Sequence, residues 1–301
     1  MSPYDRLLVP TDGSTVAEAA GNTAIRFARQ FDAALHVIHV LESDEVPAAS
    51  DDDAAREFDG RSEEVTSTIA EMAIDAGVDV QTASLDERES VHDTILEYAD
   101  EHEIDCIVMG THGRTGLDRF ILGSVAELTL REATIPVLTV HEDTVVESAF
   151  DSFLVPTDGS SCATTAADHA IDLARWTDGT LHVINVVDIS AVWGGANVAT
   201  ILDALDEAGE QTLNDVRARA KAADVTAIEG AVLDGIPYRA IVEYVEENDV
   251  DCIVMGTHGR TGLDRYLLGS VTERVIRLTD VPVLTVRERA TDTEGGPQDG
   301  Y

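Results

Sequence analysis

The sequence predicts an α/β fold that is present twice in one chain, each copy a parallel sheet with helices on both faces. Short apolar runs alternate with segments whose apolar residues recur at helical spacing, which is typical of consecutive β–α units. Three blocks of the first half recur 146 residues later, and Asp105–Val140 matches Asp251–Val286 at 26 of 36 positions. One domain is therefore duplicated, and right-handed crossovers should place its helices on both faces of the sheet.

The first copy supplies its elements in order. Buried strands are expected at short apolar runs: Arg6–Pro10, Ala34–Leu41, Val78–Leu85, Asp105–Met109 and Ile135–Val140. Helices are expected where apolar residues recur every three or four positions: Thr15–Phe31, Arg61–Ala76, Val91–His102 and Ser124–Glu132. Asp12-Gly-Ser14 is a turn that can cap the first helix, and Gly77 ends the second. Glu42–Gly60, with its acidic run, Pro47 and Gly60, is expected to be a loop.

The repeat also divides the chain. We expect a first domain at residues 1–143, a linker at 144–150, a second domain at 151–287 and an acidic tail at 288–301. The second copy should repeat the scheme of the first, with Trp193-Gly194-Gly195 in its long loop. The tail is polar and holds Gly295-Gly-Pro297, so we expect it to be disordered.

Charge is the unusual bulk property of this chain. There are 58 acidic residues against 20 lysines and arginines, giving a net charge of -38, and Lys221 is the sole lysine. The acidity is spread along both halves, and no basic stripe is present that could displace the counterions of duplex nucleic acid. An acidic, lysine-poor surface is typical of adaptation to a salt-rich cytoplasm, where self-repulsion is screened. A halophilic source is therefore a hypothesis about habitat.

Other bulk features favour a soluble, cytoplasmic protein without membrane partners. No apolar run is long enough to span a bilayer, and the N-terminus lacks the basic and apolar regions of a signal peptide. Three cysteines make no disulfide framework. Cys106 and Cys252 occupy equivalent places inside apolar runs, so we expect buried thiols.

A glycine segment follows the fourth strand of each copy. It reads Gly110-x-x-Gly113, nine residues, then Gly123-Ser124, and it recurs at residues 256–270. Glycine lets the backbone approach a ligand closely, and the free N–H groups of a helix's first turn attract an anion. The segment lacks the lysine of the P-loop, so phosphoryl-transfer machinery of that kind is not expected. The PP-loop synthetases, another class of α/β nucleotide-binding proteins, have a loop containing Ser-Gly-Gly after strand one. Here that loop reads Thr-Asp-Gly-Ser, which argues against membership of that class.

These motifs together resemble the universal stress proteins. The resemblance rests on Pro-Thr-Asp-Gly-Ser at the end of strand one, the valine ending strand two, and G-x-x-G-x(9)-G-[ST] after strand four. It spans residues 5–140 and 151–286 and points to the tandem, ATP-binding branch. It implies two Rossmann-like (HUP-type) domains, each of five parallel strands in the order 3-2-1-4-5. Nucleotide would bind at the carboxyl ends of strands one and four, the switch point of such sheets.

The resemblance also implies the contacts. Asp12 would reach the ribose or base, beside Pro10 and Thr11, while Val40 would offer backbone groups to adenine. Ribose and phosphates would meet Gly110, Gly113, Gly123, Ser124 and Val125, with Thr111, His112, Arg114 and Gly116 in the same loop. The second set is Pro156, Thr157, Asp158, Val186, Gly256, Thr257, His258, Gly259, Arg260, Gly262, Gly269, Ser270 and Val271. No catalytic residue and no protein metal ligand is expected; His36 and His39 point to opposite faces of a strand.

Several of these residues also have purely structural interpretations. Asp12 and Asp158 fit a turn at a helix start, and Ser124 and Ser270 fit ordinary N-caps. His112 and His258 are read as stabilising the loop. Arg114 and Arg119, with Arg260 and Arg265 in the second copy, would contact phosphates or pair with surface acids. One departure from the family pattern is visible: Gly235-Ile-Pro237 precedes the third helix of copy two, where copy one has Glu89-Ser-Val91.

The sequence thus favours an ATP-binding, nucleotide-responsive regulator over a fast enzyme. ADP and AMP are alternative ligands, and Mg²⁺ or Mn²⁺ would accompany the phosphates. The runs Pro136–Val140 and Pro282–Val286 should pair as sheet edges, making an intramolecular pseudo-dimer; a further homodimer is an option. A slow ATPase or nucleotide-dependent transferase, and a partner-binding module without nucleotide, are the alternative functions.

Overall fold

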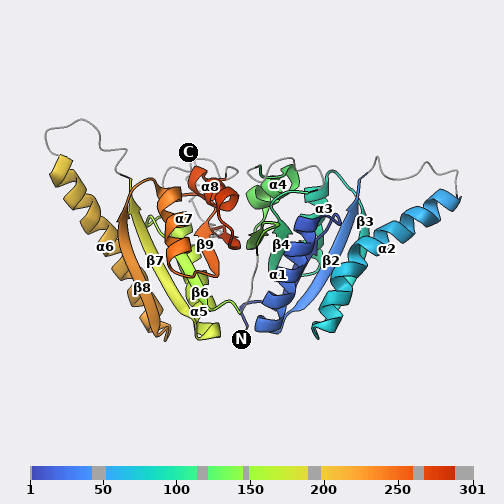
Figure 1. Cartoon of the computed structure of the whole chain (residues 1–301), viewed down its shortest axis with the longest axis horizontal. Helices are drawn as coiled ribbons and strands as arrows, with labels where there is room; N and C mark the ends of the chain where they lie inside the picture. The colour runs from blue at the N-terminus through green and yellow to red at the C-terminus, as the bar shows by residue number, and fades with distance from the viewer. Residues whose placement is uncertain are drawn as a thin grey trace, which may run out of the picture.

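The structure is a computed structural model that describes residues 2–42, 52–113, 121–144, 149–188, 198–259 and 268–288, with backbone only for 52–63, 198 and 199. Figure 1 shows two α/β units side by side, with the long helices α2 and α6 on the outer flanks. The first unit comprises β1 (Arg6–Pro10), α1 (Thr15–Phe31), β2 (Ala34–Leu41), α2 (Asp52–Asp75), β3 (Val80–Asp86), α3 (Val91–Glu101), β4 (Cys106–Gly110), α4 (Ser124–Glu132) and β5 (Val137–Val140). The second comprises β6 (Ser152–Pro156), α5 (Ser161–Thr177), β7 (Thr180–Val187), α6 (Val198–Ala222), β8 (Ala227–Asp234), α7 (Pro237–Glu247), β9 (Cys252–Gly256), α8 (Ser270–Leu278) and β10 (Val283–Val286).

The described strands form one ten-stranded sheet. Its order is β3-β2-β1-β4-β5-β10-β9-β6-β7-β8, so each copy has the predicted order 3-2-1-4-5. Pairing is parallel within each copy and antiparallel where β5 meets β10. The strand order reverses between β1 and β4 and between β6 and β9, and open parallel sheets bind their ligands at the carboxyl ends of strands at such points.

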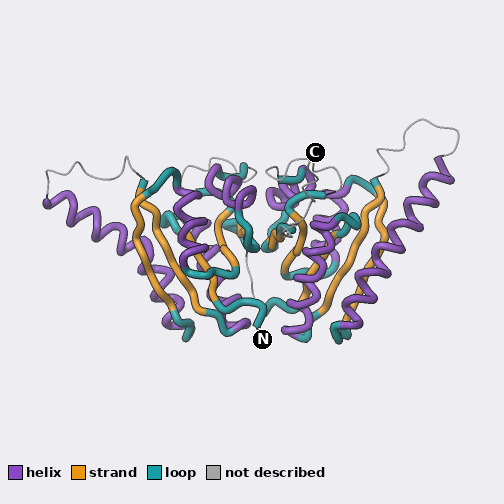
Figure 2. Tube along the Cα trace, turned by 180° about the vertical axis from the view of Figure 1, so that it is seen from behind, coloured by secondary structure: helices purple, strands orange, loops and turns teal. Residues whose placement is uncertain are grey.

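Helices cover both faces of the sheet, as the alternation of elements predicts (Figures 1 and 2). Alternate side chains of a strand enter different cores: Leu7 and Val9 pack with α1 and α2, whereas Leu8 packs with α3 and α4. The core on the α1 side is continuous across the two copies, since it includes α5 and α6 residues such as Ala166 and Leu213.

The two copies meet at a seam, where β5 pairs with β10, and the contacts across it are pseudo-symmetric. The Thr139 hydroxyl donates to the Val283 carbonyl (3.2 Å), and the equivalent Thr285 hydroxyl donates to the Val137 carbonyl (3.1 Å). Below the strands, the Gln30 amide exchanges two 2.8 Å hydrogen bonds with the Phe150 backbone. The predicted pairing of the copies through strand five is therefore present within one chain.

Most predicted elements agree with the structure to within one or two residues, and the loop over Glu42–Gly60 is wrong in its second part. Helix α2 begins at Asp52 and continues through Gly60. Acidic residues in the first turn of a helix are favoured by its dipole, and one glycine costs a long helix only about 1 kcal/mol. The expected loop around Trp193 and the expected disordered tail after Glu288 lie outside the described residues.

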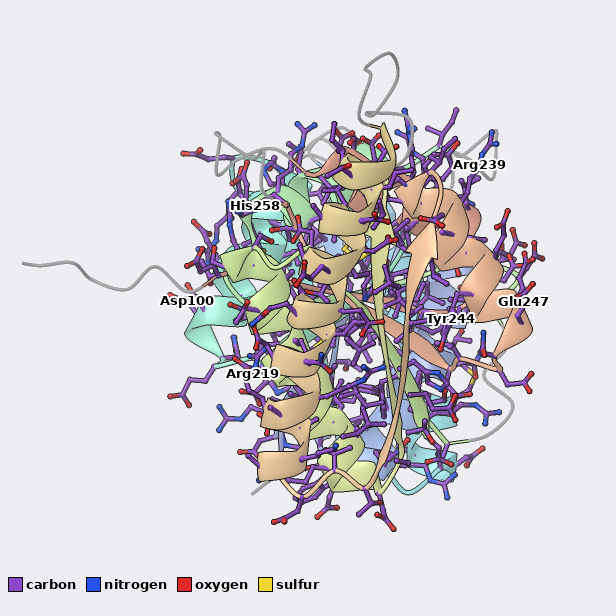
Figure 3. All side chains as sticks on the ribbon, turned by 90° about the vertical axis from the view of Figure 1, so that its left-hand side faces the viewer. Asp100, Arg219, Arg239, Tyr244, Glu247 and His258 are labelled. Atoms are coloured by element: carbon purple, nitrogen blue, oxygen red, sulfur yellow. The ribbon has the colours of Figure 1, made fainter. Side chains whose placement is uncertain are left out.

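The surface is charged and the thiols are internal. Figure 3 shows the flank of the second copy, where Arg219, Arg239 and Glu247 project at the periphery. Cys106 and Cys252 are both fully buried, as expected, and burial raises the pKa of the Cys252 thiol to about 12. Among the helices that the structure describes, none is both long and apolar enough to cross a membrane.

Candidate functional site

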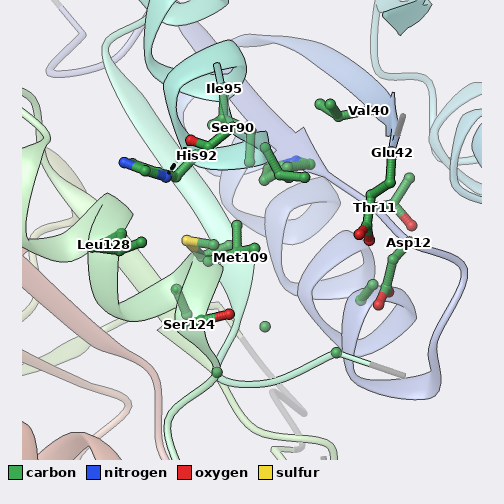
Figure 4. A pocket seen from close by; sticks show the side chains of 18 of the residues that line it. Thr11, Asp12, Val40, Glu42, Ser90, His92, Ile95, Met109, Ser124 and Leu128 are labelled. Carbon is green, nitrogen blue, oxygen red and sulfur yellow. Dashed lines mark hydrogen bonds between the residues drawn. The ribbon is translucent and has the colours of Figure 1, made fainter. Parts of the chain in front are cut away.

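The first copy holds a cavity of about 560 Å³ at the carboxyl ends of β1 and β4. It opens where the strand order reverses, which is where open parallel sheets bind their ligands. Figure 4 shows Thr11 and Asp12 on one side of the cavity, with Ser90 and His92 opposite. The lining includes Pro10, Thr11, Asp12, Val40, Gly110, His112, Gly113, Gly123, Ser124 and Val125 from the sequence-predicted set.

The loop after β1 forms one wall through a tight turn. The Ser14 N–H donates to Asp12 Oδ1 (3.0 Å), and the Ser14 hydroxyl donates to the same oxygen (2.6 Å). Ser14 in turn caps α1 by accepting from the Ala17 N–H (3.3 Å). Gly13 has φ +77, a conformation that favours glycine. The turn interpretation of Asp12 is therefore correct, and it still leaves the side chain lining the cavity.

Asp12 and Gly113 lie against each other in the lining of the cavity. A Cβ atom at Gly113 would lie 2.6 Å from Asp12 Oδ2, too close for any side chain without displacing the carboxylate. The second copy repeats this, with the same 2.6 Å between Asp158 Oδ2 and a Cβ at Gly259. The glycine therefore brings the loop backbone against a carboxylate at the same place in both copies.

Helix α4 presents its first turn to this cavity without a side-chain cap. Its N-cap is Gly123 and that of α8 is Gly269, and neither helix start has a capping side chain. The interpretation of Ser124 and Ser270 as N-caps is therefore wrong; both are the first residue inside their helix. Glycine has no side chain to satisfy the N–H groups of the first turn, which leaves them to water or a ligand.

Thr111 and His112 stabilise the glycine loop that follows β4. Thr111 is buried and is not part of the cavity lining. Its Oγ1 lies 3.1 Å from His141 Nδ1, and His141 Nε2 contacts the Ile276 carbonyl of the second copy. His112 Nδ1 lies 3.3 Å from Thr111 Oγ1, which is the loop-stabilising contact expected of it. His258 has the equivalent contact with Thr257 at 3.1 Å.

Six arginines and glycines of the two loops lie outside the described residues. Gly116 and Gly262 are among them, together with the arginines of both loops: Arg114, Arg119, Arg260 and Arg265.

The second copy repeats this framework, by which we mean the aspartate–glycine pair and the helix start with a glycine N-cap. A few neighbouring residues differ between the copies. Where His39 Nδ1 donates to the Thr11 carbonyl (2.8 Å), Asn185 Nδ2 donates to the Thr157 carbonyl (2.7 Å). Beneath Gly110 lies Val16, whereas Cys162 lies beneath Gly256. The exchange of His39 for Asn185 therefore keeps the loop after the first strand in place. The sequence itself repeats Pro156, Asp158, Gly269, Ser270 and Val271 at the positions equivalent to those of the first copy.

One wall of the cavity was missed by the sequence prediction. It comes from the loop after β3 and from α3 and α4, and it includes Glu87, Ser90, Val91, His92, Ile95 and Leu128. The departure of Glu89-Ser-Val91 from the family pattern was the available signal. Ser90 caps α3 by accepting from the Asp93 N–H (3.2 Å), whereas the equivalent Ile236 offers no side-chain cap to α7.

One sheet made of two parallel halves, each with a glycine-lined switch point, defines a tandem Rossmann-like α/β protein. The universal stress protein family model matches residues 3–141 and again 149–287. The chain belongs to the universal stress protein family.

Its relatives agree with this assignment. A universal stress protein of Mycolicibacterium smegmatis is 30% identical over 303 residues, which covers 94% of this chain and 97% of that protein. One from Methanocaldococcus jannaschii is 41% identical over 145 residues, which covers 47% of this chain and 85% of that protein. The crystal structure of a universal stress protein from Archaeoglobus fulgidus superposes with a TM-score of 0.70 at 25% identity, covering 94% of this chain and 98% of that one.

Proposed function

We propose that the chain binds adenine nucleotide at two sites, one per copy, with ATP as the preferred ligand. The observation that carries the proposal is the pairing of an aspartate with a glycine beside an uncapped helix start, repeated with equal geometry at Asp12–Gly113 and Asp158–Gly259. The carboxylate can accept hydrogen bonds from ribose hydroxyls or the base, while the helix N–H groups can receive phosphate oxygens.

The apolar part of the cavity lining suits a planar base, because Val40, Ile95 and Met109 contribute to it. A Mg²⁺ or Mn²⁺ ion would enter with the triphosphate, held by its oxygens. We propose a regulatory rather than a fast catalytic role, because the sole lysine, Lys221, lies on α6 of the second copy and no lysine is available to the loops. The proposed setting is the cytoplasm of a salt-adapted cell.

Substitution of each loop glycine tests the assignment. Gly113→Val and Gly259→Val each place a branched side chain against the opposing carboxylate, so each should remove one ATP per chain, and the double variant should bind none. Isothermal titration in high potassium chloride measures the stoichiometry, and circular dichroism checks that each variant is folded.

Each copy serves as the matched control for the other. ATP stoichiometry that stays unchanged in both single variants would show that the loops are not the site. ADP, AMP and cAMP belong in the same titration, because one universal stress protein has been solved in complex with cAMP.

A further inference from the structure

A histidine and two carboxylates converge beside the first-copy cavity. His92 and Asp93 lie in the first turn of α3, and Glu132 is the last residue of α4. Their nearest ligand atoms all lie within 4.8 Å of one another. His92 also lines the cavity, so the cluster forms part of its rim (Figure 4).

Ser90 fixes which histidine nitrogen faces the carboxylates. Its Oγ lies 2.6 Å from Asp93 Oδ2 and 2.6 Å from His92 Nδ1. A hydroxyl has one hydrogen, and the carboxylate can only accept it, so the contact with the ring requires Nδ1–H to donate to Ser90 Oγ. In the neutral ring, Nε2 then carries the lone pair. A second partner that fixes the tautomer in this way is usual for histidines that bind metals.

The distances from Nε2 fit a shared cation better than direct hydrogen bonds. Nε2 lies 3.5 Å from Asp93 Oδ1 and 3.7 Å from Glu132 Oε2, longer than the usual N–H···O range. Ligand atoms held about 2.1 Å from a tetrahedral metal are separated by about 3.4 Å. The two separations from Nε2 are close to this value, and all three ligand atoms lie within 4.8 Å of one another, so they surround a place for one cation.

The exposure of the cluster leaves room for further ligands. The His92 side chain is 12% exposed, while those of Asp93 and Glu132 are 34% and 41% exposed. Water can therefore complete the coordination sphere from the carboxylate side. One imidazole with two carboxylates suits divalent first-row metals such as zinc, and the net charge of -38 raises the local concentration of cations.

The second copy has the same backbone without these ligands. Tyr238, Arg239 and Leu278 replace His92, Asp93 and Glu132. The Arg274 guanidinium lies 5.0 Å from the Tyr238 ring centroid, in the place where the first copy has Leu128. That wall is cationic and aromatic, so it should repel a metal ion.

We propose that His92, Asp93 and Glu132 form a binding site for one divalent transition-metal ion of the zinc class, present in the first copy alone. The two halves of the chain then differ in ligand chemistry even though their glycine loops match. The site takes its three protein ligands from this chain and needs no bound nucleotide.

The test is a Co²⁺ titration of the full chain, freed of nucleotide and metal, in high potassium chloride to screen the acidic surface. Co²⁺ reports its coordination through visible absorption, and Zn²⁺ should displace it. We expect one site per chain. His92→Ala and Glu132→Gln should each weaken affinity at least tenfold, and the triple exchange to the second-copy residues (H92Y, D93R, E132L) should abolish the absorption band.

Glu127→Gln is the matched control, because Glu127 is an acid of the same helix that pairs with Arg131. It should leave the Co²⁺ affinity unchanged. The proposal is overturned if His92→Ala and Glu132→Gln bind Co²⁺ as tightly as the parent chain, if the parent shows no such band, or if the band persists in the triple variant.

Discussion

Each site aspartate serves the fold and the cavity at once. Asp12 Oδ1 holds the turn that starts α1 by accepting from Ser14, and Oδ2 faces Gly113. Asp12 is identifiable from the sequence because its neighbours Pro10, Gly13 and Ser14 form a local pattern. The pattern alone does not distinguish a turn from a ligand contact, since both use the same side chain and the cavity also needs the distant loop that contains Gly113.

Two buried histidines give the stability a pH dependence. His36 Nδ1 and His182 Nδ1 each lie 3.0 Å from a tyrosine hydroxyl, that of Tyr98 or Tyr244. Burial lowers the pKa of both histidines, aided at His36 by the charges of His102 and Arg6 and opposed by Asp79; Glu229 opposes it at His182.

Because these folded-state pKa values lie below the unfolded value of about 6.5, the unfolded chain binds protons first as the pH falls. The stabilisation is complete above that value and is lost as the pH drops through 6.5 towards the folded pKa. In the double variant His36→Asn/His182→Asn, the free energy of unfolding should change less between pH 7.5 and 5.5 than in the parent. Urea unfolding at the two pH values measures this, and an equal change in both proteins would contradict it.

At the scale of elements, strands and short amphipathic helices were predictable. β1, α1, β2 and α4 match their expected bounds because each has a clear apolar period and a turn or glycine at its end. The start of α2 was not predictable, because an acidic run with Pro47 before it and Gly60 within it looks like a loop in isolation. The α3 wall of the cavity was missed because β3 and α4 bring together residues far apart in sequence.

The strand-five seam gives a prediction at this scale. Thr139→Val and Thr285→Val each remove one buried hydrogen bond across β5 and β10 while keeping the shape of the side chain. Each should lower the free energy of unfolding by roughly 0.5–1.5 kcal/mol, and the two losses should be similar. Chemical unfolding measures them.

Thr165→Val is the control, because Thr165 is only half-buried on α5 and its hydroxyl donates to the Ser161 carbonyl of the same helix. Its effect should stay within about 0.5 kcal/mol. If Thr139→Val and Thr285→Val lower the free energy of unfolding no more than this control, the seam hydroxyls do not stabilise the pairing of the copies.

The molecule as a whole is one sheet with a core on each face, both cores shared by the two copies, and it carries a large excess of acid. With a net charge of -38, repulsion among surface carboxylates opposes the folded state and is screened as the Debye length falls to about 3 Å at 1 M salt. The midpoint temperature of unfolding should therefore rise between 0.1 and about 2 M potassium chloride. Scanning calorimetry measures it; a midpoint that falls or stays constant would contradict the electrostatic account.

Because both copies have the same framework, the number of ATP molecules bound per chain tests the proposed function. Both copies pair an aspartate with a glycine at the same distance and both begin their loop helix without a side-chain cap. The most direct test is to count the ATP bound by the nucleotide-free parent chain, by calorimetric titration and by release on denaturation. The account predicts two per chain. No binding at millimolar ATP would contradict it, and a single site would show that equal frameworks do not make equal sites.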